Sequence, residues 1–423
     1  MIFKKSLRRY NSIGKEEIKA ANEVLKSGAL SPFLGSWPDI PNVGSFYGGK
    51  KVQLFERNLE KFYGSKYAIT VNSWTSGLIA AVGAIDVEPG DEIITSPWTM
   101  CATVTSIIHW AAIPVFADIE EDTFNLDINS ILSKINKKTK AIIIPEIFGH
   151  PFDVLTLKKK LKNFDRKIYL ISDNAQSPLG KYKGKYTCNF YDIGGFSYNY
   201  HKHIQTGEGG ALVTNSKNLA ERMYLIRNHG EAVVGPRKIK KINNIIGYNF
   251  RMGEIEAAIG SSQLKKVFKL VKQRISIANF LSRNLKNFNG LTIPKIKDGF
   301  NHNFYVYALK YDSSKTGISR DRIVKKLKSL GAPVVPGYAN IHLYPMFQKK
   351  IAYGKNHFPW SLSKSSMKIS YNKGICPISE NMNENSIIKI PICDYQFSVD
   401  DQKKLIQCFL ETWKFFRISS EKI

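Results

Sequence analysis

A lysine, a carboxylate and a hydroxyl follow apolar runs in the middle of this chain. An apolar run at 168–171 leads to Asp173, and a second strand-like run at 191–200 carries Ser197, with Lys202 five residues later. In open α/β sheets, ligands bind at the carboxyl ends of the strands, where these side chains would meet. A lysine amine that condenses with an aldehyde, an Asp that keeps a ring nitrogen protonated and hydroxyls that hold a phosphate are what a pyridoxal phosphate (PLP) site requires.

Each of these residues alone has an ordinary explanation. An Asp after a strand commonly caps the next helix, and a Lys is commonly a solvated surface charge. The whole string is more specific, because D-x-A-Q is followed by F-S-x-x-x-x-K-x-x-x-x-G-E-G-G. This pattern resembles the DegT-type sugar aminotransferases, a family of PLP enzymes of fold type I. The resemblance covers nearly all of the chain, is strongest over 72–263 and is weak after 331.

The resemblance implies a role for each matching residue. Lys202 would bind PLP covalently and then move a proton between the substrate and the cofactor. Asp173 would pair with the pyridine nitrogen, and Gln176 would face the phenolic oxygen of the ring. The phosphate would be held by Thr75, Ser76, Ser197 and, from a second subunit, Asn249, which lies in a segment that resembles the family's G-x-N-x-R-M.

The segment 67–85 supports the phosphate assignment from its own residues. An apolar strand at 67–71 is followed by a polar turn at 72–78 and a helix of small residues at 79–85. A helix that starts in this way presents free N–H groups and the positive end of its dipole to an anion. The plain alternative is a helix cap made by Ser73 or Thr75, and the two interpretations are compatible.

One position departs from the family pattern. The family usually has an aromatic residue over the cofactor ring at the position of Met100, whereas here the aromatic residue is Trp98, two residues earlier. Either the thioether of Met100 covers the ring, as sulfur can, or Trp98 has another role.

Lys202 also separates two classes of enzyme within the family. Some relatives carry His at this position and act as sugar dehydratases that use pyridoxamine phosphate (PMP). Here Lys202 is flanked by His201 and His203, and its spacing from Ser197 aligns the lysine with the nucleophile, so a transaminase is favoured. The two His residues have no third ligand at metal spacing, and no metal site is expected.

The reaction implied by the resemblance is transfer of an amino group to a keto-sugar. Glutamate or glutamine would be the donor, and the acceptor would be a nucleotide-linked sugar used for surface polysaccharide or amino-sugar biosynthesis. A non-nucleotide ketone, such as a keto-inositol or a small phosphorylated ketone, stays open, as does a PMP-dependent dehydratase. The position of Asn249 implies a homodimer with shared active sites.

The elements around these residues alternate between strand and helix. Strands are expected at 67–71, 92–95, 114–119, 141–147, 167–173, 191–200, 211–214 and 303–311, and helices at 15–27, 52–63, 79–85, 218–227, 254–285, 320–330 and 400–416. This alternation predicts an α/β protein whose large domain has a mainly parallel central sheet. We expect that large PLP-binding domain at 1–265 and a smaller α/β domain at 266–423.

Composition narrows the remaining possibilities. The 423 residues carry a formal net charge of +27, but the basic residues are spread along the chain and form no nucleic-acid-binding motif. No nucleic-acid partner and no membrane span are expected. Five scattered cysteines without C-x-x-C spacing are typical of reduced thiols, so a cytoplasmic location is expected. A basic loop at 237–241 is expected near the mouth of the site, where it would favour an anionic substrate.

Overall fold

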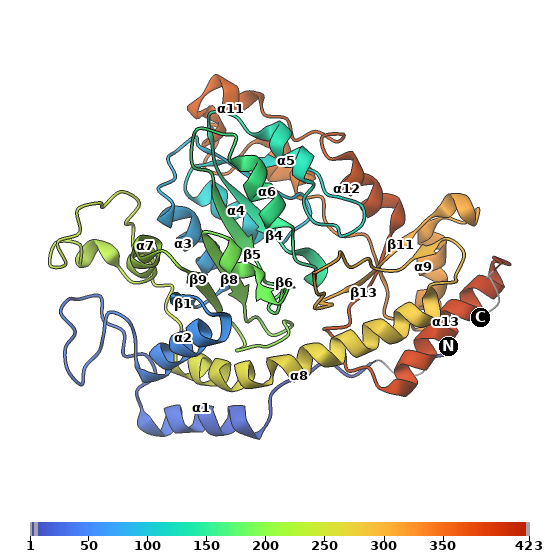
Figure 1. Ribbon diagram of the computed structural model, residues 1–423, viewed down its shortest axis with the longest axis horizontal. Coiled ribbons are helices and arrows are strands. Elements are labelled where there is room, and N and C mark those ends of the chain that lie inside the picture. The colour runs from blue at the N-terminus through green and yellow to red at the C-terminus, as the bar shows by residue number, and fades with distance from the viewer. Residues whose placement is uncertain (1, 4–6, 420–423) are drawn as a thin grey trace.

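The computed structural model describes residues 2–3 and 7–419, and helices flank the two larger sheets of this part of the chain (Figure 1). Within it, the larger sheet has 7 strands in the order β1-β9-β8-β5-β4-β2-β3. Their bounds are β1 (Tyr67–Val71), β9 (Gly210–Thr214), β8 (Ile193–Ser197), β5 (Tyr169–Asp173), β4 (Thr139–Pro145), β2 (Glu92–Thr95) and β3 (Ile113–Phe116). Strand β9 is antiparallel to both neighbours, and the other strands run parallel to one another. The predicted mainly parallel sheet is therefore confirmed.

The strands of this sheet are short apolar runs because helices cover both of its faces. In β4, Ile143 packs with one layer of helices and Ile142 with the other, as the alternation of side chains along a strand requires. The first layer is made by α3 (Trp74–Ala84), α4 (Cys101–His109) and α7 (Lys217–Arg227). The second layer is made by α2 (Lys50–Tyr63), α5 (Ile128–Lys134), α6 (Val154–Leu161) and the first half of α8 (Glu254–Leu285).

The smaller sheet is antiparallel and has the order β10-β11-β13-β12. Its strands are β10 (Leu291–Thr292), β11 (Tyr307–Tyr311), β13 (Ile387–Ile390) and β12 (Val335–Pro336). Leu309 and Ile388 face a core formed with α9 (Arg320–Ser329), α13 (Val399–Phe415) and the last turns of α8. The C-terminal part of the chain is thus α/β, as predicted.

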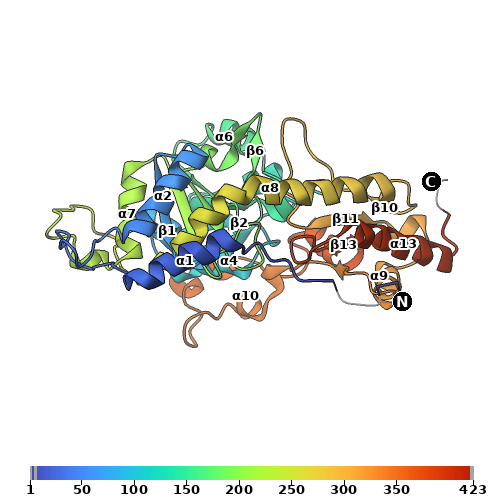
Figure 2. The same cartoon turned by 90° about the horizontal axis from the view of Figure 1, so that it is seen from below.

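Helix α8, 32 residues long, runs beneath both sheets and connects them (Figures 1 and 2). Its first half packs against α1 (Lys15–Ser27), and its last turns reach α13. The proposed boundary at residue 265 falls inside α8 and stays a prediction. Part of the later chain returns to the larger sheet, because Ile341, Phe347 and Trp360 pack against Val104 of α4.

The remaining described elements are short: α10 (Pro345–Lys349), α11 (Lys364–Lys368), α12 (Pro377–Asn381), and the small hairpin of β6 (Lys181–Tyr182) and β7 (Lys185–Tyr186). Across residues 2–3 and 7–419, no helix combines the length and the apolar character needed to cross a membrane.

Candidate active site

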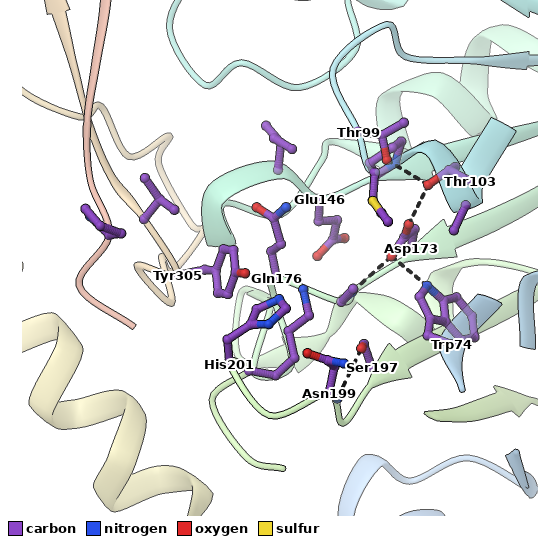
Figure 3. Close-up of a pocket in the computed structure, with 18 of the residues that line it drawn as sticks. Trp74, Thr99, Thr103, Glu146, Asp173, Gln176, Ser197, Asn199, His201 and Tyr305 are labelled. Atoms are coloured by element: carbon purple, nitrogen blue, oxygen red, sulfur yellow. Dashed lines mark hydrogen bonds between the residues drawn. The ribbon is translucent and has the colours of Figure 1, made fainter. Parts of the chain in front are cut away.

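A cavity of about 570 Å³ lies where β4, β5 and β8 end and the smaller sheet begins (Figure 3). The predicted site residues that line it are Thr75, Met100, Asp173, Gln176, Ser197 and Lys202. These residues come from the ends of strands, the start of α3 and the turn after β8. The carboxyl edge of the sheet therefore gathers side chains that are up to 127 positions apart in the sequence, from Thr75 to Lys202.

Asp173 is the last residue of β5 and is held by three donors. Its Oδ1 accepts hydrogen bonds from Trp74 Nε1 at 2.8 Å and Ala175 N at 3.1 Å, and its Oδ2 accepts one from Thr103 Oγ1 at 2.9 Å. Burial raises the pKa of Asp173 above its usual range, while the three donors and the charge of Lys202 lower it. A carboxylate has about four acceptor positions, so Oδ2 can still take one further donor.

Lys202 follows a tight turn in which its backbone N donates to Asn199 O at 2.9 Å. The Nζ atom lies 4.6 Å from the centre of the Tyr305 ring. Burial lowers the pKa of Lys202, and the charge of Asp173 opposes this effect. Because a neutral amine is the nucleophile, a buried lysine is a better one at neutral pH than a surface lysine.

Hydroxyl groups and the start of α3 form one end of the cavity. Ser73 caps α3, since its Oγ accepts a hydrogen bond from Ser76 N at 3.1 Å. Thr75 and Ser197 line the cavity, whereas Ser76 is buried at the cap and is not among the lining residues. This arrangement is compatible with both a helix cap and an anion-binding helix start. Ser76 contributes to the helix cap, through its backbone N–H, and does not line the cavity.

Gln176 lies between the loop after β4 and the smaller sheet. Its Oε1 accepts a hydrogen bond from Phe148 N at 2.6 Å, and its Nε2 lies 3.4 Å from the hydroxyl of Tyr338. Phe148 has a positive φ of 55°, so the amide of Gln176 stabilises a loop conformation that non-glycine residues rarely adopt.

Met100 rather than Trp98 faces the cavity. Met100 is 63% exposed and lines the cavity, whereas Trp98 is fully buried and donates from Nε1 to Asn340 Oδ1 at 2.9 Å. Trp98 packs in the contact between the larger sheet and residues 338–387. Of the two residues, Met100 is the one that can reach a ligand in the cavity, and its place over the ring stays a prediction.

Glu146 is a second buried carboxyl group beside Asp173, because it follows Pro145, which pairs with Asp173 in the sheet. Thr187 Oγ1 and the hydroxyl of Tyr191 donate to it at 3.2 and 3.3 Å. Burial raises the pKa of Glu146 to about 7. At neutral pH this group therefore adds only part of a negative charge to the floor of the cavity.

Asn249 is not among the residues that line this cavity. It lies in a neighbouring pocket of about 370 Å³, where Arg251 Nε donates to its Oδ1 at 2.7 Å. Glu208 lines both pockets, so Asn249 is close to the mouth of the cavity. Its expected contribution to a partner's site stays a prediction.

The basic loop at 237–241 is partly held by its own chain. Arg237 pairs with Glu221 at 3.0 Å, and Lys241 forms an ion pair with Asp86. The other two lysines of the loop are exposed, and none of its residues lines the cavity of Lys202. Only Lys238 and Lys240 therefore remain as candidates of this loop for binding an anionic substrate.

Comparison with known proteins agrees with this geometry. The model of the DegT/DnrJ/EryC1/StrS aminotransferase family matches residues 33–391. The chain belongs to this family.

Individual relatives cover most of the chain. A spore coat polysaccharide biosynthesis protein, SpsC, of Bacillus subtilis is 30% identical over 89% of this chain and 92% of its own length. A GDP-perosamine synthase of Escherichia coli O157:H7 is 32% identical over 71% of this chain and 80% of its own length. Among solved structures, the aminotransferase PseC of Helicobacter pylori superimposes with a TM-score of 0.76, at 27% identity over 97% of this chain and 100% of that one.

As a member of this aminotransferase family, the chain is a PLP-dependent aminotransferase. The cavity fits the cofactor. Asp173 has a free acceptor position for a protonated ring nitrogen, Lys202 supplies a half-buried amine, and the hydroxyl end of the cavity at Thr75 and Ser197 suits a phosphate.

Several lining residues were not found from the sequence. Trp74 stands inside the predicted polar turn, and only the fold shows that its indole reaches Asp173. Tyr305, Lys389 and Arg9 lie outside the segment of strongest resemblance, and they meet the cavity only through tertiary contacts. For the described residues, no group of three or more His, Cys, Asp or Glu side chains is placed to hold a metal ion.

Proposed function

We propose that this aminotransferase transfers an amino group from glutamate or glutamine to a keto-sugar, most simply a nucleotide-linked one. The product would be an amino sugar for surface polysaccharide or related biosynthesis. The observation that carries the proposal is the placement of Lys202 and Asp173 in one buried cavity. A cytoplasmic location, expected from the scattered cysteines, belongs to the same proposal.

The names of the relatives support the choice of substrate. Two of them name sugars linked to a nucleotide: the GDP-perosamine synthases and a UDP-4-amino-4,6-dideoxy-N-acetyl-β-L-altrosamine transaminase of H. pylori, the latter 31% identical over 80% of this chain. SpsC names a polysaccharide pathway. A keto group on a nucleotide-linked sugar is therefore the acceptor class that we propose.

Three residues of the cavity would have distinct roles in this reaction. PLP, when bound, supplies the electron sink that makes the α-proton of the substrate acidic. Asp173 keeps a proton on the ring nitrogen, because its ionised carboxylate has three donors and a free acceptor position. Lys202 first holds the cofactor and then carries a proton from the α-carbon of the substrate, for which a lowered pKa suits it. Met100, which lines the cavity, would cover the cofactor ring when it is bound.

The proposal predicts that Lys202 carries the cofactor. Wild-type protein incubated with PLP should show a visible absorbance band that resists dialysis, and Lys202→Ala should lose both the band and transamination. Lys326→Ala is a suitable control, because this half-buried lysine on α9 does not line the cavity. A wild-type-like, dialysis-resistant band in Lys202→Ala would rule out this assignment.

The same measurement distinguishes a transaminase from a PMP-dependent dehydratase. A PMP-dependent dehydratase needs no covalent link to a lysine, so it would bind its cofactor equally well in wild type and Lys202→Ala. A transaminase should instead convert glutamate to its keto acid in a half-reaction that needs no sugar. Product mass with candidate keto-sugars and keto-inositols would then decide between nucleotide-linked and free acceptors.

A further inference from the structure

Lys389 occupies an unusual position in the smaller sheet. Side chains alternate along β13, and Ile388 and Ile390 point into the core formed with α9 and α13. The other face of β13 looks toward the larger sheet, where Ile387 packs with Phe148 and Trp98. Lys389 shares that face and lines the cavity, so it places an amine opposite the carboxyl edge of the larger sheet.

The positive charge of the Lys389 amine has no bonded partner among the described residues. It lies 4.6 Å from the centre of the Tyr338 ring, and among residues 2–3 and 7–419 it takes part in no ion pair and no side-chain hydrogen bond. Burial lowers the pKa of Lys389 to about 8, and the charge of Asp394 opposes this effect. A half-buried cation that faces a cavity without a bonded anion is a place where an anionic ligand binds favourably.

Asp394, the carboxylate whose charge acts on the pKa of Lys389, also faces other cations. Burial raises the pKa of Asp394, and the charges of Arg9, Lys202 and Lys389 oppose this effect, so three cations share one carboxylate at this end of the cavity. Arg9 lines the mouth of the cavity with its guanidinium 5.0 Å from the centre of the Tyr395 ring. Once Lys202 is linked to the cofactor, Lys389 and Arg9 remain as two cations for a substrate.

Lys389 and Gln176 lie on the same side of the cavity, because both contact Tyr338. The ring beneath the Lys389 amine is that of Tyr338, and the hydroxyl of Tyr338 is 3.4 Å from Gln176 Nε2. Asp173 is the last residue of β5 and Gln176 follows it, so a substrate held at Lys389 would approach the same edge of the sheet from the opposite wall. This placement suits a substrate that must present its amine to Lys202.

We propose that Lys389 binds a carboxylate of the amino donor and that Arg9 at the mouth binds a second one. The ligand class is a dicarboxylic amino acid, of which L-glutamate is the common example. This inference rests on the proposed function, because it assigns a substrate group to the same cavity. A carboxylate at Lys389 forms a charge-assisted hydrogen bond in a partly desolvated place, where such bonds are strong.

The test uses PLP-loaded enzyme and measures the donor half-reaction, which needs no sugar. Loss of the cofactor absorbance on titration with L-glutamate gives an apparent Kd. Lys389→Met should raise this Kd about 10- to 100-fold, the factor expected for the loss of one hydrogen bond to a charged group. Lys389→Arg should keep the Kd close to wild type, and Arg9→Met should weaken L-glutamate more than L-alanine.

A binding measurement without turnover accompanies this titration. Succinate, a dicarboxylate that cannot react, should bind to the wild-type holoenzyme by calorimetry and lose affinity by a similar factor in Lys389→Met. Lys326→Met is the matched control, because Lys326 is also half-buried and lies 4.0 Å from the centre of an aromatic ring, that of Phe415, outside the cavity. It should leave both constants unchanged. Lys389→Gln keeps a polar group and serves as the second variant if Lys389→Met folds poorly.

Three outcomes overturn the inference. Unchanged constants for both L-glutamate and succinate in Lys389→Met would show that Lys389 meets no donor carboxylate. An intact donor half-reaction, with loss only toward a keto-sugar that carries a carboxylate, would assign Lys389 to the acceptor. Equal losses in Lys326→Met would reveal a general structural effect. If wild-type protein forms no lysine-bound cofactor, the proposed function fails, and succinate binding still decides the role of Lys389.

Discussion

At the scale of single residues, Trp74 is the least expected neighbour of the reacting groups. Its indole N–H donates to Asp173 Oδ1 at 2.8 Å, and the ring is almost completely buried. A tryptophan offers one donor and no acceptor, so it stabilises the ionised form of this carboxylate more than the protonated form. Trp74 is therefore a positioning residue that acts through Asp173.

Trp74→Phe should weaken PLP binding about 5- to 30-fold, because it removes one donor from a buried carboxylate and keeps most of the ring. The pH at which the bound cofactor changes its absorbance should shift as well, since loss of the Trp74 donor raises the pKa of Asp173, the proposed partner of the ring nitrogen. Equilibrium dialysis and a spectroscopic pH titration measure the two effects.

Trp110→Phe is the matched control for this change. Trp110 lies in the same core and also donates from its indole, to Ile79 O at 2.8 Å, but it does not touch Asp173. Equal shifts in both variants would mean that Trp74 contributes only packing.

The sequence predicted those site residues whose positions follow from nearby strand ends and short spacings along the chain. Asp173 and Ser197 stand at the ends of apolar runs, and Lys202 follows at a fixed spacing, so the strand ends alone bring them together. Trp74 and Lys389 could not be found in this way. Whether an indole turns inward or a lysine on β13 faces a cavity depends on packing between segments that are far apart in the chain.

At the scale of elements, β8 is shaped to receive Trp74. A Cβ atom on Gly195 would lie 1.7 Å from Trp74 Cη2, and one on Gly77 would lie 2.6 Å from Trp74 Cε3. Glycine at these two places leaves the space that the indole fills between β8 and α3. The close approach of strand and helix therefore fixes the direction of the donor to Asp173.

Gly195→Ala should displace the indole and lower the free energy of unfolding by about 1–3 kcal/mol, the usual cost of overpacking a core. Urea unfolding of the apo-protein measures this loss. Trp74→Ala combined with Gly195→Ala should be less destabilised than the sum of the two single changes, because the alanine no longer meets a ring.

Gly235→Ala serves as the control, since no atom lies within 4 Å of a Cβ atom at that position. Strictly additive effects of Trp74→Ala and Gly195→Ala would contradict the idea of a glycine slot.

Element boundaries were predicted well where the local signal is strong. Helix Lys15–Ser27 and strand Glu92–Thr95 have the predicted bounds, because a glycine ends the first and turn residues precede the second. The helix expected at 79–85 begins earlier, at Trp74, since Ser73 caps it. The strand expected at 191–200 ends at Ser197, because the chain turns at Asn199 toward Lys202. The strand expected at 303–311 is shorter for a similar reason, as its first residues pack against the loop at Gly149.

At the scale of the whole molecule, we propose a homodimer in which Asn249 reaches the site of the partner. Asn249 lies in a pocket beside the cavity and is not among the residues that line it. Lys202→Ala and Asn249→Ala should each be inactive. Subunit exchange between them should restore about a quarter of wild-type activity, because half of the dimers are hybrids and each hybrid has one intact site. Chromatography of differently tagged chains confirms that hybrids form.

No recovery in such a mixture of proven hybrids would show that each site is built from one chain. A wild-type monomer at working concentrations would contradict the shared site as well.

Buried histidines should make the whole protein sensitive to acid. Burial lowers the pKa of His203 to about 3 and that of His150 to about 4, below the usual value of 6.5. The unfolded state then binds more protons than the folded state below about pH 6.5, so stability falls as the pH drops from 7 to 5. Each group contributes about 2 kcal/mol to this loss.

His203→Asn should therefore make the melting temperature of the holoenzyme less dependent on pH between 5 and 7, even if the variant is less stable at pH 7. His357→Asn, at the exposed surface, is the comparison variant. Scanning calorimetry at several pH values gives both slopes, and an unchanged slope in His203→Asn would show that this histidine is not buried in the neutral form.

The pairing of Arg9 with Tyr395 has a consequence for how the chain acquires its activity. The backbone N of Tyr10 donates to Asp394 O at 2.9 Å, and that of Gln396 donates to Arg8 O at 2.9 Å, so segments from near the two ends of the chain meet at the mouth of the cavity. Contacts between segments so distant in sequence form late, because a long loop must close first. During synthesis, the larger sheet and Lys202 can be in place while this wall is still missing. A growing chain can thus take up its cofactor early, but it completes the wall that binds a substrate only after residues 394–396 have left the ribosome.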